Sequence, residues 1–241
     1  MFPILFALIA GLFTGLGALI IFIFKPTKAF MSVSIGFASG IMLTLAFTGL
    51  LHESMAISYK SAIIGFAFGA LLILILDSLL PHIEFSILEK GIIDKKIFKT
   101  AMLVAIGMSL HNLPEGFAIS ASFYHLPAFG LFIAVAMALH NIPEGIAIAL
   151  PIVSAGGSRK RALTISFLAG LSEPLGAVIG VLLLSSVFGL IPLALAFAAG
   201  VMVYLTIDEL LPMAQRYKHP HGMGFGVIAG CVVAILISTI I

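Results

Sequence analysis

The clearest pattern in the chain is a series of long apolar runs, separated by short segments that carry turn residues or charges. A helix needs about 20 apolar residues to cross the hydrocarbon core of a bilayer. The runs that reach this length cover approximately residues 2–24, 31–56, 60–81, 98–122, 127–153, 161–185, 190–213 and 221–241. They are too long and too continuous for the alternating strands of a membrane barrel. The pattern therefore predicts an all-α, polytopic membrane protein with eight transmembrane helices.

The composition agrees with a protein that lies almost wholly in the bilayer. Of the 241 residues, 61% are apolar and only 9% are charged, whereas soluble domains have about 25% charged residues. We expect one transmembrane domain over residues 1–241, a retained first helix in place of a cleaved signal peptide, and no nucleic-acid partner. The single cysteine, Cys231, rules out an internal disulfide and a thiolate metal cage.

The basic residues indicate how the helices are oriented. Of the 12 Lys and Arg residues, only Lys60 lies outside the loops that follow the first, third, fifth and seventh runs. Loops rich in Lys and Arg stay in the cytoplasm. We therefore expect these loops in the cytoplasm, both termini outside, and the protein in the cell membrane.

One motif occurs twice within the apolar runs. Residues 111–116 read HNLPEG and residues 140–145 read HNIPEG. A histidine and a glutamate four residues apart lie on one face of a helix, and imidazole and carboxylate are common ligands of divalent metals. Pro114 and Pro143 predict kinks that free backbone carbonyls at Leu110 and Leu139.

Three carboxylates fall near the centres of the fourth, fifth and sixth runs: Glu115, Glu144 and Glu173. Each charge there costs about 2.5–3.5 kcal/mol on insertion scales, and the stretch 100–158 contains no Lys or Arg. Either the acids are protonated, or a cation from outside the chain balances them. A divalent cation fits, and so does proton exchange with it.

Other ionisable residues lie toward the ends of the runs. His52 and Glu53 end the second run on the outer side and predict an entry path. A cytoplasmic exit path is predicted at the ends of the third and seventh runs, from Asp77, His82, Asp208 and Glu209. Met42 could add a thioether ligand, although a core methionine is the commoner explanation.

The two motif copies, with residues 172–176 (SEPLG) and 208–212 (DELLP), closely resemble the ZIP (Zrt/Irt-like protein) family of divalent metal transporters, in its short prokaryotic form. The resemblance covers essentially the whole chain. It implies a 3+2+3 arrangement, with the fourth and fifth helices between inverted three-helix repeats. It also implies uptake of Zn²⁺, Fe²⁺, Mn²⁺, Co²⁺ or Cd²⁺ into the cytoplasm, as substrate and not as resident cofactor, and it suggests a homodimer.

The resemblance further implies a two-metal centre. By motif position, one site consists of His111, Glu115, His140 and Glu144. The other consists of Asn112, Glu115, Asn141, Glu144 and Glu173, so that Glu115 and Glu144 bridge the two ions. Met42 matches a further ligand position on the second helix.

Two other functions compete with metal transport. An intramembrane zinc hydrolase also needs histidines and acids in the membrane, but it typically holds one metal with three protein ligands and an open water position. The His-Glu-x-x-His motif is absent, and two quasi-symmetric half-sites stand in its place. A proton or cation channel is the third hypothesis; carboxylates that bridge tightly held ions favour a slower carrier.

Overall fold

The computed structural model describes residues 2–79 and 95–241, and every regular element in them is helical. The elements in chain order are α1 (Phe2–Ile23), α2 (Lys28–Thr44), η1 (Leu45–Leu51), α3 (His52–Ile57), α4 (Tyr59–Leu79), α5 (Lys95–His125), α6 (Pro127–Ser154), α7 (Arg159–Gly170), α8 (Ser172–Leu184), η3 (Phe188–Leu190), α9 (Ile191–Leu205), η4 (Thr206–Leu210), α10 (Leu211–Arg216) and α11 (Gly222–Ile240). The prediction of an all-α protein is confirmed.

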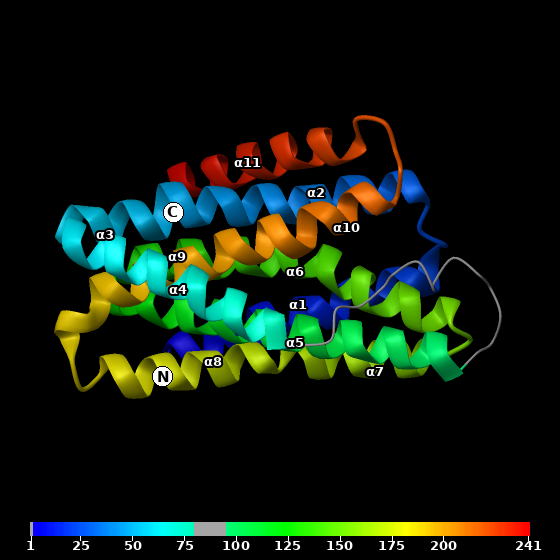
Figure 1. The fold of residues 1–241 in the computed structure, drawn as a ribbon, viewed down its shortest axis with the longest axis horizontal. Coiled ribbons are helices and arrows are strands. Elements are labelled where there is room, and N and C mark those ends of the chain that lie inside the picture. Colours follow the sequence, from blue (N-terminus) through cyan, green and yellow to red (C-terminus); the bar gives the residue numbers. More distant parts are fainter. Residues whose placement is uncertain (1, 80–94) are drawn as a thin grey trace.

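Several of these elements join into longer rods that match the predicted membrane crossings. Among the described residues, seven helical stretches are long and apolar enough to span a bilayer: Phe2–Ile23, Lys28–Ile57, Tyr59–Leu76, Pro127–Ser154, Arg159–Leu184, Ile191–Arg216 and Gly222–Ile240. The 31-residue helix α5 supplies the remaining crossing. Both termini lie at the same end of the molecule, at the left in Figure 1, as an even number of crossings requires.

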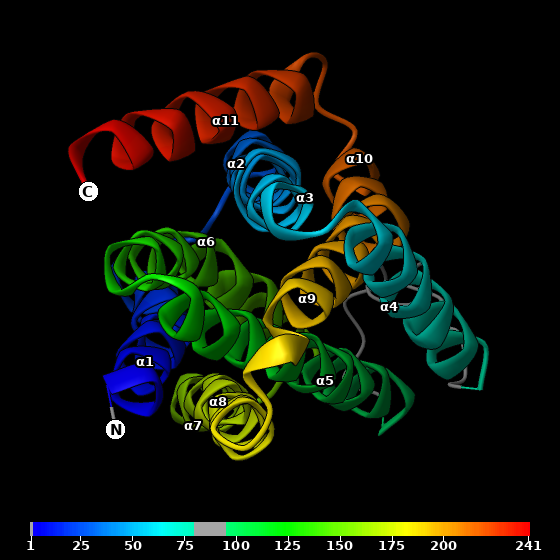
Figure 2. The same ribbon diagram turned by 90° about the vertical axis from the view of Figure 1, so that its left-hand side faces the viewer.

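The helices pack in two groups, which are visible end-on in Figure 2. In the first bundle, α1 packs on α6 and α7, while α5 packs on α6 and α8. In the second bundle, α11 packs on α2 and α4 packs on α9. The bundles meet where α2 contacts α6 and where α5 contacts α9. Both copies of the repeated motif therefore belong to the first bundle and face its border with the second.

Glycines bring the motif helices close to their neighbours. A Cβ at Gly116 in α5 would overlap the carbonyl of Glu173 in α8, and a Cβ at Gly145 in α6 would overlap the carbonyl of Thr14 in α1. Small residues let helix backbones approach closely in a membrane, where van der Waals packing drives association. The last residue of each motif copy thus fixes how near its helix lies to the next.

The motif prolines do not break their helices. Both α5 and α6 continue as helices through Pro114 and Pro143. The sixth crossing is interrupted instead, because α7 ends at Gly170 and α8 begins at Ser172. This break places Pro174 in the first turn of α8, where a missing N–H leaves no intrahelical bond unmade.

Two π-helical segments interrupt the second and seventh crossings: η1 at Leu45–Leu51 and η4 at Thr206–Leu210. Threonine hydroxyls bond to carbonyls of the preceding turn beside both of them, from Thr48 to Thr44 at 2.7 Å and from Thr206 to Met202 at 2.7 Å. Such segments are often found at functional sites, and each of these directly precedes or contains a pair of polar residues named above.

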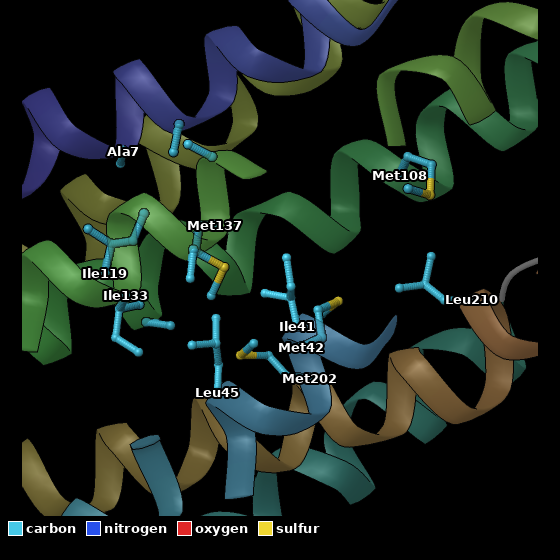
Figure 3. Close-up of a cluster of buried hydrophobic side chains, with 14 of the residues drawn as sticks. Ala7, Ile41, Met42, Leu45, Met108, Ile119, Ile133, Met137, Met202 and Leu210 are labelled. Atoms are coloured by element: carbon cyan, nitrogen blue, oxygen red, sulfur yellow. The ribbon is translucent and has the colours of Figure 1, made fainter. Parts of the chain in front are cut away.

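A continuous apolar core joins the two bundles. Figure 3 shows part of it, with Met42 and Leu45 of the second bundle near Met137 of the first. Met42 is fully buried, and its sulfur lies 3.7 Å from the Thr206 hydroxyl oxygen. This contact ties α2 to η4.

Candidate metal centre

The two motif copies meet through their histidines and glutamates. Nε2 of His140 lies 3.0 Å from Oε1 of Glu115 and 3.5 Å from Oε1 of Glu144. Nε2 of His111 lies 3.3 Å and 3.6 Å from the same two oxygens. Each imidazole therefore faces both carboxylates, one from its own helix and one from the other.

These spacings are compatible with ligand atoms that share one metal ion. Zinc binds histidine nitrogen and carboxylate oxygen at about 2.0–2.2 Å, so its ligand atoms lie about 3.3–3.6 Å from one another. The four nitrogen–oxygen distances, from 3.0 to 3.6 Å, fall close to that range. Among the described residues, His111, Glu115 and Glu144 also form a group whose ligand atoms all lie within 4.8 Å.

The cluster is buried and contains more hydrogen-bonding capacity than it uses. Its four side chains are at most 1% exposed. Within the described part of the chain, several of their polar atoms have no hydrogen-bond partner: Nδ1 and Nε2 of His111, Oε2 of Glu115, Nδ1 of His140 and Oε1 of Glu144. Buried polar groups are almost always paired. Unpaired donors and acceptors at this density indicate a place for a ligand.

A second polar group lies beside the first, between α6, α8 and α1. The side-chain amide of Asn141 donates to Oε2 of Glu173 at 2.8 Å and to the carbonyl of Ala10 at 2.8 Å. Oε1 of Glu173 and Oδ1 of Asn141 are buried and have no partner in the described residues. Glu173 lies in the first turn of α8, where the helix dipole favours a negative charge.

Asn112 occupies the matching position on α5. Its amide nitrogen lies 3.5 Å from the carbonyl of Ala169. After a 180° rotation the same nitrogen donates to the carbonyl of Met108 at 2.9 Å and to Oε2 of Glu144 at 3.3 Å. The rotated amide makes the better bonds, because its oxygen no longer faces only acceptors. Either orientation places Asn112 against the acidic centre.

The π-helical segment η4 brings another carboxylate to this centre. Oε2 of Glu209 lies 3.9 Å from Nδ1 of His111, and the Glu209 side chain is 28% exposed. Asp208, one residue earlier, is exposed. An apolar cavity of about 610 Å³, bounded by α4, α5, α8 and α9, also reaches His111 and Glu209. Glu209 therefore connects the buried cluster with a more open region.

At the end of the molecule near the termini, the two bundles are joined by a hydrogen bond between His125 and Glu53. Nε2 of His125, at the end of α5, lies 2.8 Å from Oε2 of Glu53 in α3. The two side chains are 15% and 32% exposed. The His125 ring also packs edge-on against Phe129 of α6, with 5.8 Å between ring centroids.

Comparison with known proteins decides the family. The model of the family described as ZIP Zinc transporter matches residues 88–238. A protein named zinc transporter ZupT from Streptococcus mutans is 39% identical over 242 residues, covering 93% of this chain and 92% of its own length. The chain belongs to the ZIP zinc transporter family. The ZupT proteins of Oceanobacillus iheyensis and Chlorobaculum parvum are 38% and 37% identical, covering 94% and 97% of this chain and 92% and 95% of their own lengths.

Membership in the ZIP family confirms the predicted resemblance and the multi-pass membrane location. Because the family consists of transporters, the alternative of an intramembrane zinc hydrolase falls away.

The structure shows the positions of most of the predicted site residues of this ZIP protein, but not of all of them. It brings together the histidines, glutamates and asparagines of both motif copies with Glu173. Met42 packs in the core against Thr206, and its role as a ligand remains a prediction. Asp77 lies in α4, but its side chain is outside the described part of the structure, and so is all of His82.

Sequence reasoning missed one ionisable residue of the ZIP chain and misjudged another. His125 was not among the predicted site residues, yet it ends α5 and contacts Glu53. Glu209 was placed toward the helix end, yet it reaches within 3.9 Å of the cluster. The helical length of α5 could have indicated the first. The second depends on how η4 is rotated, which no local pattern reveals.

Proposed function

We propose that this ZIP protein carries divalent metal cations, zinc among them, across the membrane into the cytoplasm through the His–Glu cluster of α5 and α6. The observation that carries the proposal is the set of four nitrogen–oxygen distances between 3.0 and 3.6 Å in a fully buried cluster. Two carboxylates at this depth need a compensating charge, and the described part of the chain places no Lys or Arg beside them. A metal ion held by His111, Glu115, His140 and Glu144 supplies that charge.

A second ion is proposed beside the first, with Glu115 and Glu144 bridging. Its other ligands are Asn112, Asn141 and Glu173. The unpaired Oε2 of Glu115, Oε1 of Glu173 and Oδ1 of Asn141 support this assignment, since each is a buried acceptor without a donor among the described residues. Oxygen-rich ligand sets of this kind suit Mn²⁺ and Fe²⁺ as well as Zn²⁺.

The proposed path enters beside His52 and Glu53 and leaves past Asp208 and Glu209. Glu53 is partly exposed at the end where the termini lie, and its bond to His125 links the entry to the motif helix. Glu209 contacts His111 and is itself 28% exposed, which suits a ligand that takes over an ion from the centre. Asp77 and His82 are proposed further along this exit.

Repeated contacts support an inverted repeat around this centre. Residues 10–20 (AGLFTGLGALI) and 169–179 (AGLSEPLGAVI) agree at 7 of 11 positions, as counted from the sequence. Gly11 and Gly170, at matching positions in these segments, each lie against the carbonyl of the other. The side-chain amide of Asn141 bonds to the carbonyl of Ala10, and the end of the Asn112 side chain lies 3.5 Å from the carbonyl of Ala169 in either orientation of its amide.

The repeat is unequal in one chemically important place. Thr14 stands where the other half has Glu173, and its hydroxyl is buried without a hydrogen-bond partner among the described residues. One half of the proposed second site therefore offers a carboxylate and the other half a neutral oxygen. This asymmetry predicts that the site formed by both motif copies binds metal more strongly than the site at Glu173.

The transport proposal is tested by reconstituting the protein in liposomes and measuring the entry of ⁶⁵Zn or ⁵⁵Fe, with competing metals at two pH values. We expect metal-dependent influx that zinc inhibits. Folded protein that gives no flux above that of empty liposomes would contradict the proposal.

The placement of the centre is tested with two variants in the same assay. Glu144→Ala removes a carboxylate from the cluster and is expected to abolish flux. His52→Ala changes an exposed residue at the entry and is expected only to slow it. Equal losses in both variants would argue against this placement.

A further inference from the structure

A hollow at the start of α11 takes no part in the proposed metal path. It has a volume of about 320 Å³ and lies between the beginnings of α2 and α11 and the turn that joins α10 to α11. Its polar lining comes from Ser32, Gln215, Lys218, His219 and His221. Every charge that these residues can carry is positive.

The first turn of α11 faces this hollow, and some of its backbone N–H groups make no hydrogen bond to the described residues. The N–H groups of Gly222 and Phe225 bond to the carbonyls of His219 and His221 at 3.3 and 2.9 Å. No side chain caps this helix, and the N–H groups of Met223 and Gly224 have no partner in the described part of the chain. The start of a 19-residue helix also carries a partial positive charge.

A buried hydroxyl provides an independent sign of a ligand. Ser32 of α2 lines the hollow and is only 1% exposed, and its Oγ has no hydrogen-bond partner among the described residues. A Cβ at Gly222 would lie 3.1 Å from this Oγ and 2.6 Å from Nδ1 of His219. The glycine therefore leaves room for both groups to lie against the start of the helix.

Among the described residues, the helices and the turn that line the hollow add no negative charge. Neither residues 1–52, which include all of α2, nor residues 210–241, which include α10 and α11, contain an Asp or Glu. Backbone N–H groups, a hydroxyl, a lysine and imidazoles around a helix start are the donors that bind phosphate in proteins.

We propose that this hollow binds a phosphate group, supplied either by a phospholipid headgroup or by a free phosphate compound. The turn between α10 and α11 lies at the end of the molecule opposite the termini, at the right in Figure 1. In a membrane protein, that end lies at the depth of the headgroups. One phosphate oxygen accepts from Met223 and Gly224, and another accepts from Ser32 and Lys218. The site is independent of the proposed metal path.

The test uses the full-length protein, purified in detergent and depleted of lipid. Phosphatidylglycerol, a diacylglycerol with the same acyl chains, and inorganic phosphate are each titrated, and bound ligand is counted by native mass spectrometry. We expect phosphatidylglycerol to bind and diacylglycerol to bind at least about tenfold more weakly, since a hydrogen bond to a charged group is typically worth that factor or more. If inorganic phosphate displaces the lipid, the hollow also accepts a free phosphate compound. If inorganic phosphate does not displace the lipid, the hollow is specific for phospholipid headgroups.

Two variants locate the binding. Ser32→Ala removes the buried hydroxyl without changing any charge, and Lys218→Gln removes one cation at the rim. Each is expected to weaken phosphatidylglycerol binding about tenfold. Lys60→Gln, which removes a cation far from the hollow in sequence, serves as the matched control and is expected to bind as the unchanged protein does.

Three results would overturn the proposal. The first is equal binding of phosphatidylglycerol and diacylglycerol, and the second is no binding of either lipid or phosphate. The third is full binding by Ser32→Ala and Lys218→Gln, with melting temperatures equal to that of the unchanged protein. A loss that is equally large in Lys60→Gln would also overturn it, because it would reflect net charge alone.

Discussion

At the scale of residues, the centre combines groups that would be unfavourable in a membrane if each stood alone. Glu115 and Glu144 are buried acids, and the histidines that face them are buried bases at 3.0 to 3.6 Å. Each histidine or glutamate lowers the free-energy cost of burying the group that faces it. A metal ion that replaced the protons shared between these groups would bind all four side chains at once. In the proposed centre, protons and metal would therefore compete for the same atoms.

This competition predicts a pH dependence of metal binding. Neutral imidazole and ionised carboxylate are the forms that ligate metal, so zinc binding releases protons and weakens as the pH falls from 8 to 5.5. Calorimetry in two buffers of different ionisation enthalpy measures the number of protons released. A binding constant that stays unchanged over this pH range would contradict the exchange.

Asn141 provides a second test at this scale. Asn141→Asp replaces the N–H donor that faces Glu173 at 2.8 Å with a second carboxylate. Without metal, we expect the variant to lose about 2–3 kcal/mol of stability, since it exchanges a hydrogen bond for like-charge repulsion. Added zinc should restore much of that loss, as measured by melting temperature with EDTA or with zinc.

The control for this variant is Ser122→Ala, which removes a hydroxyl that bonds to the carbonyl of Ala118 within α5. It should melt almost as the unchanged protein does under both conditions. An Asn141→Asp protein that zinc fails to stabilise would count against the second ion.

At the scale of elements, the geometry of the centre depends on how closely four helices approach. Gly116 lets α5 lie against α8, and Gly145 lets α6 lie against α1. Because each glycine directly follows the glutamate of its motif copy, the spacing of the helices and the position of the glutamates are set by neighbouring residues. A change in one is expected to disturb the other.

Substitutions at two glycines of α5 distinguish the effect of close helix packing from the effect of helix propensity. Gly116→Ala places a methyl group against the carbonyl of Glu173 and should destabilise the protein by about 1–3 kcal/mol. Gly107→Ala meets no atom within 4 Å and should be neutral or stabilising by up to about 1 kcal/mol. Thermal unfolding in detergent measures both, and similar values would refute the role of close approach.

At the scale of the whole molecule, two bundles meet along the centre, and the hydrogen bond between His125 and Glu53 joins them at one end. Both termini lie at that same end (Figure 1). The basic residues Lys28 and Lys160 lie in the first turns of α2 and α7, and these helices begin at the opposite end of the molecule (Figure 1). The excess of Lys and Arg in the loops at that end favours a cytoplasmic location for them.

This orientation is tested by cysteine labelling in intact cells. With Cys231→Ser as background, Lys60→Cys should react with a membrane-impermeant maleimide added outside, and Lys160→Cys should react only after permeabilisation. Both positions are exposed in the structure. The reverse pattern of labelling would place the termini in the cytoplasm and reverse the direction of the proposed path.

Much of the fold and part of the candidate site could be predicted from local patterns in the sequence. The apolar runs match the helical stretches to within a few residues, because about 20 apolar residues in a row have few stable states other than a membrane helix. The shared orientation of the histidine and the glutamate in each motif copy followed from their i, i+4 spacing, since both residues must share a helix face. The break at Leu171 and the π-helical segments had no equally clear signal.

The sequence by itself determined the number of helices, the depth of the acids and the two His–Glu pairs, because these depend on chain length and helical periodicity. Only the tertiary structure decided which carboxylates each histidine faces, that Asn141 bonds to Glu173 and Ala10, and that Glu209 and His125 reach across between bundles. The physical reason is that such contacts depend on how each helix is rotated about its axis and how closely it packs. Those quantities are set by side chains and glycines of other helices, far away in the chain.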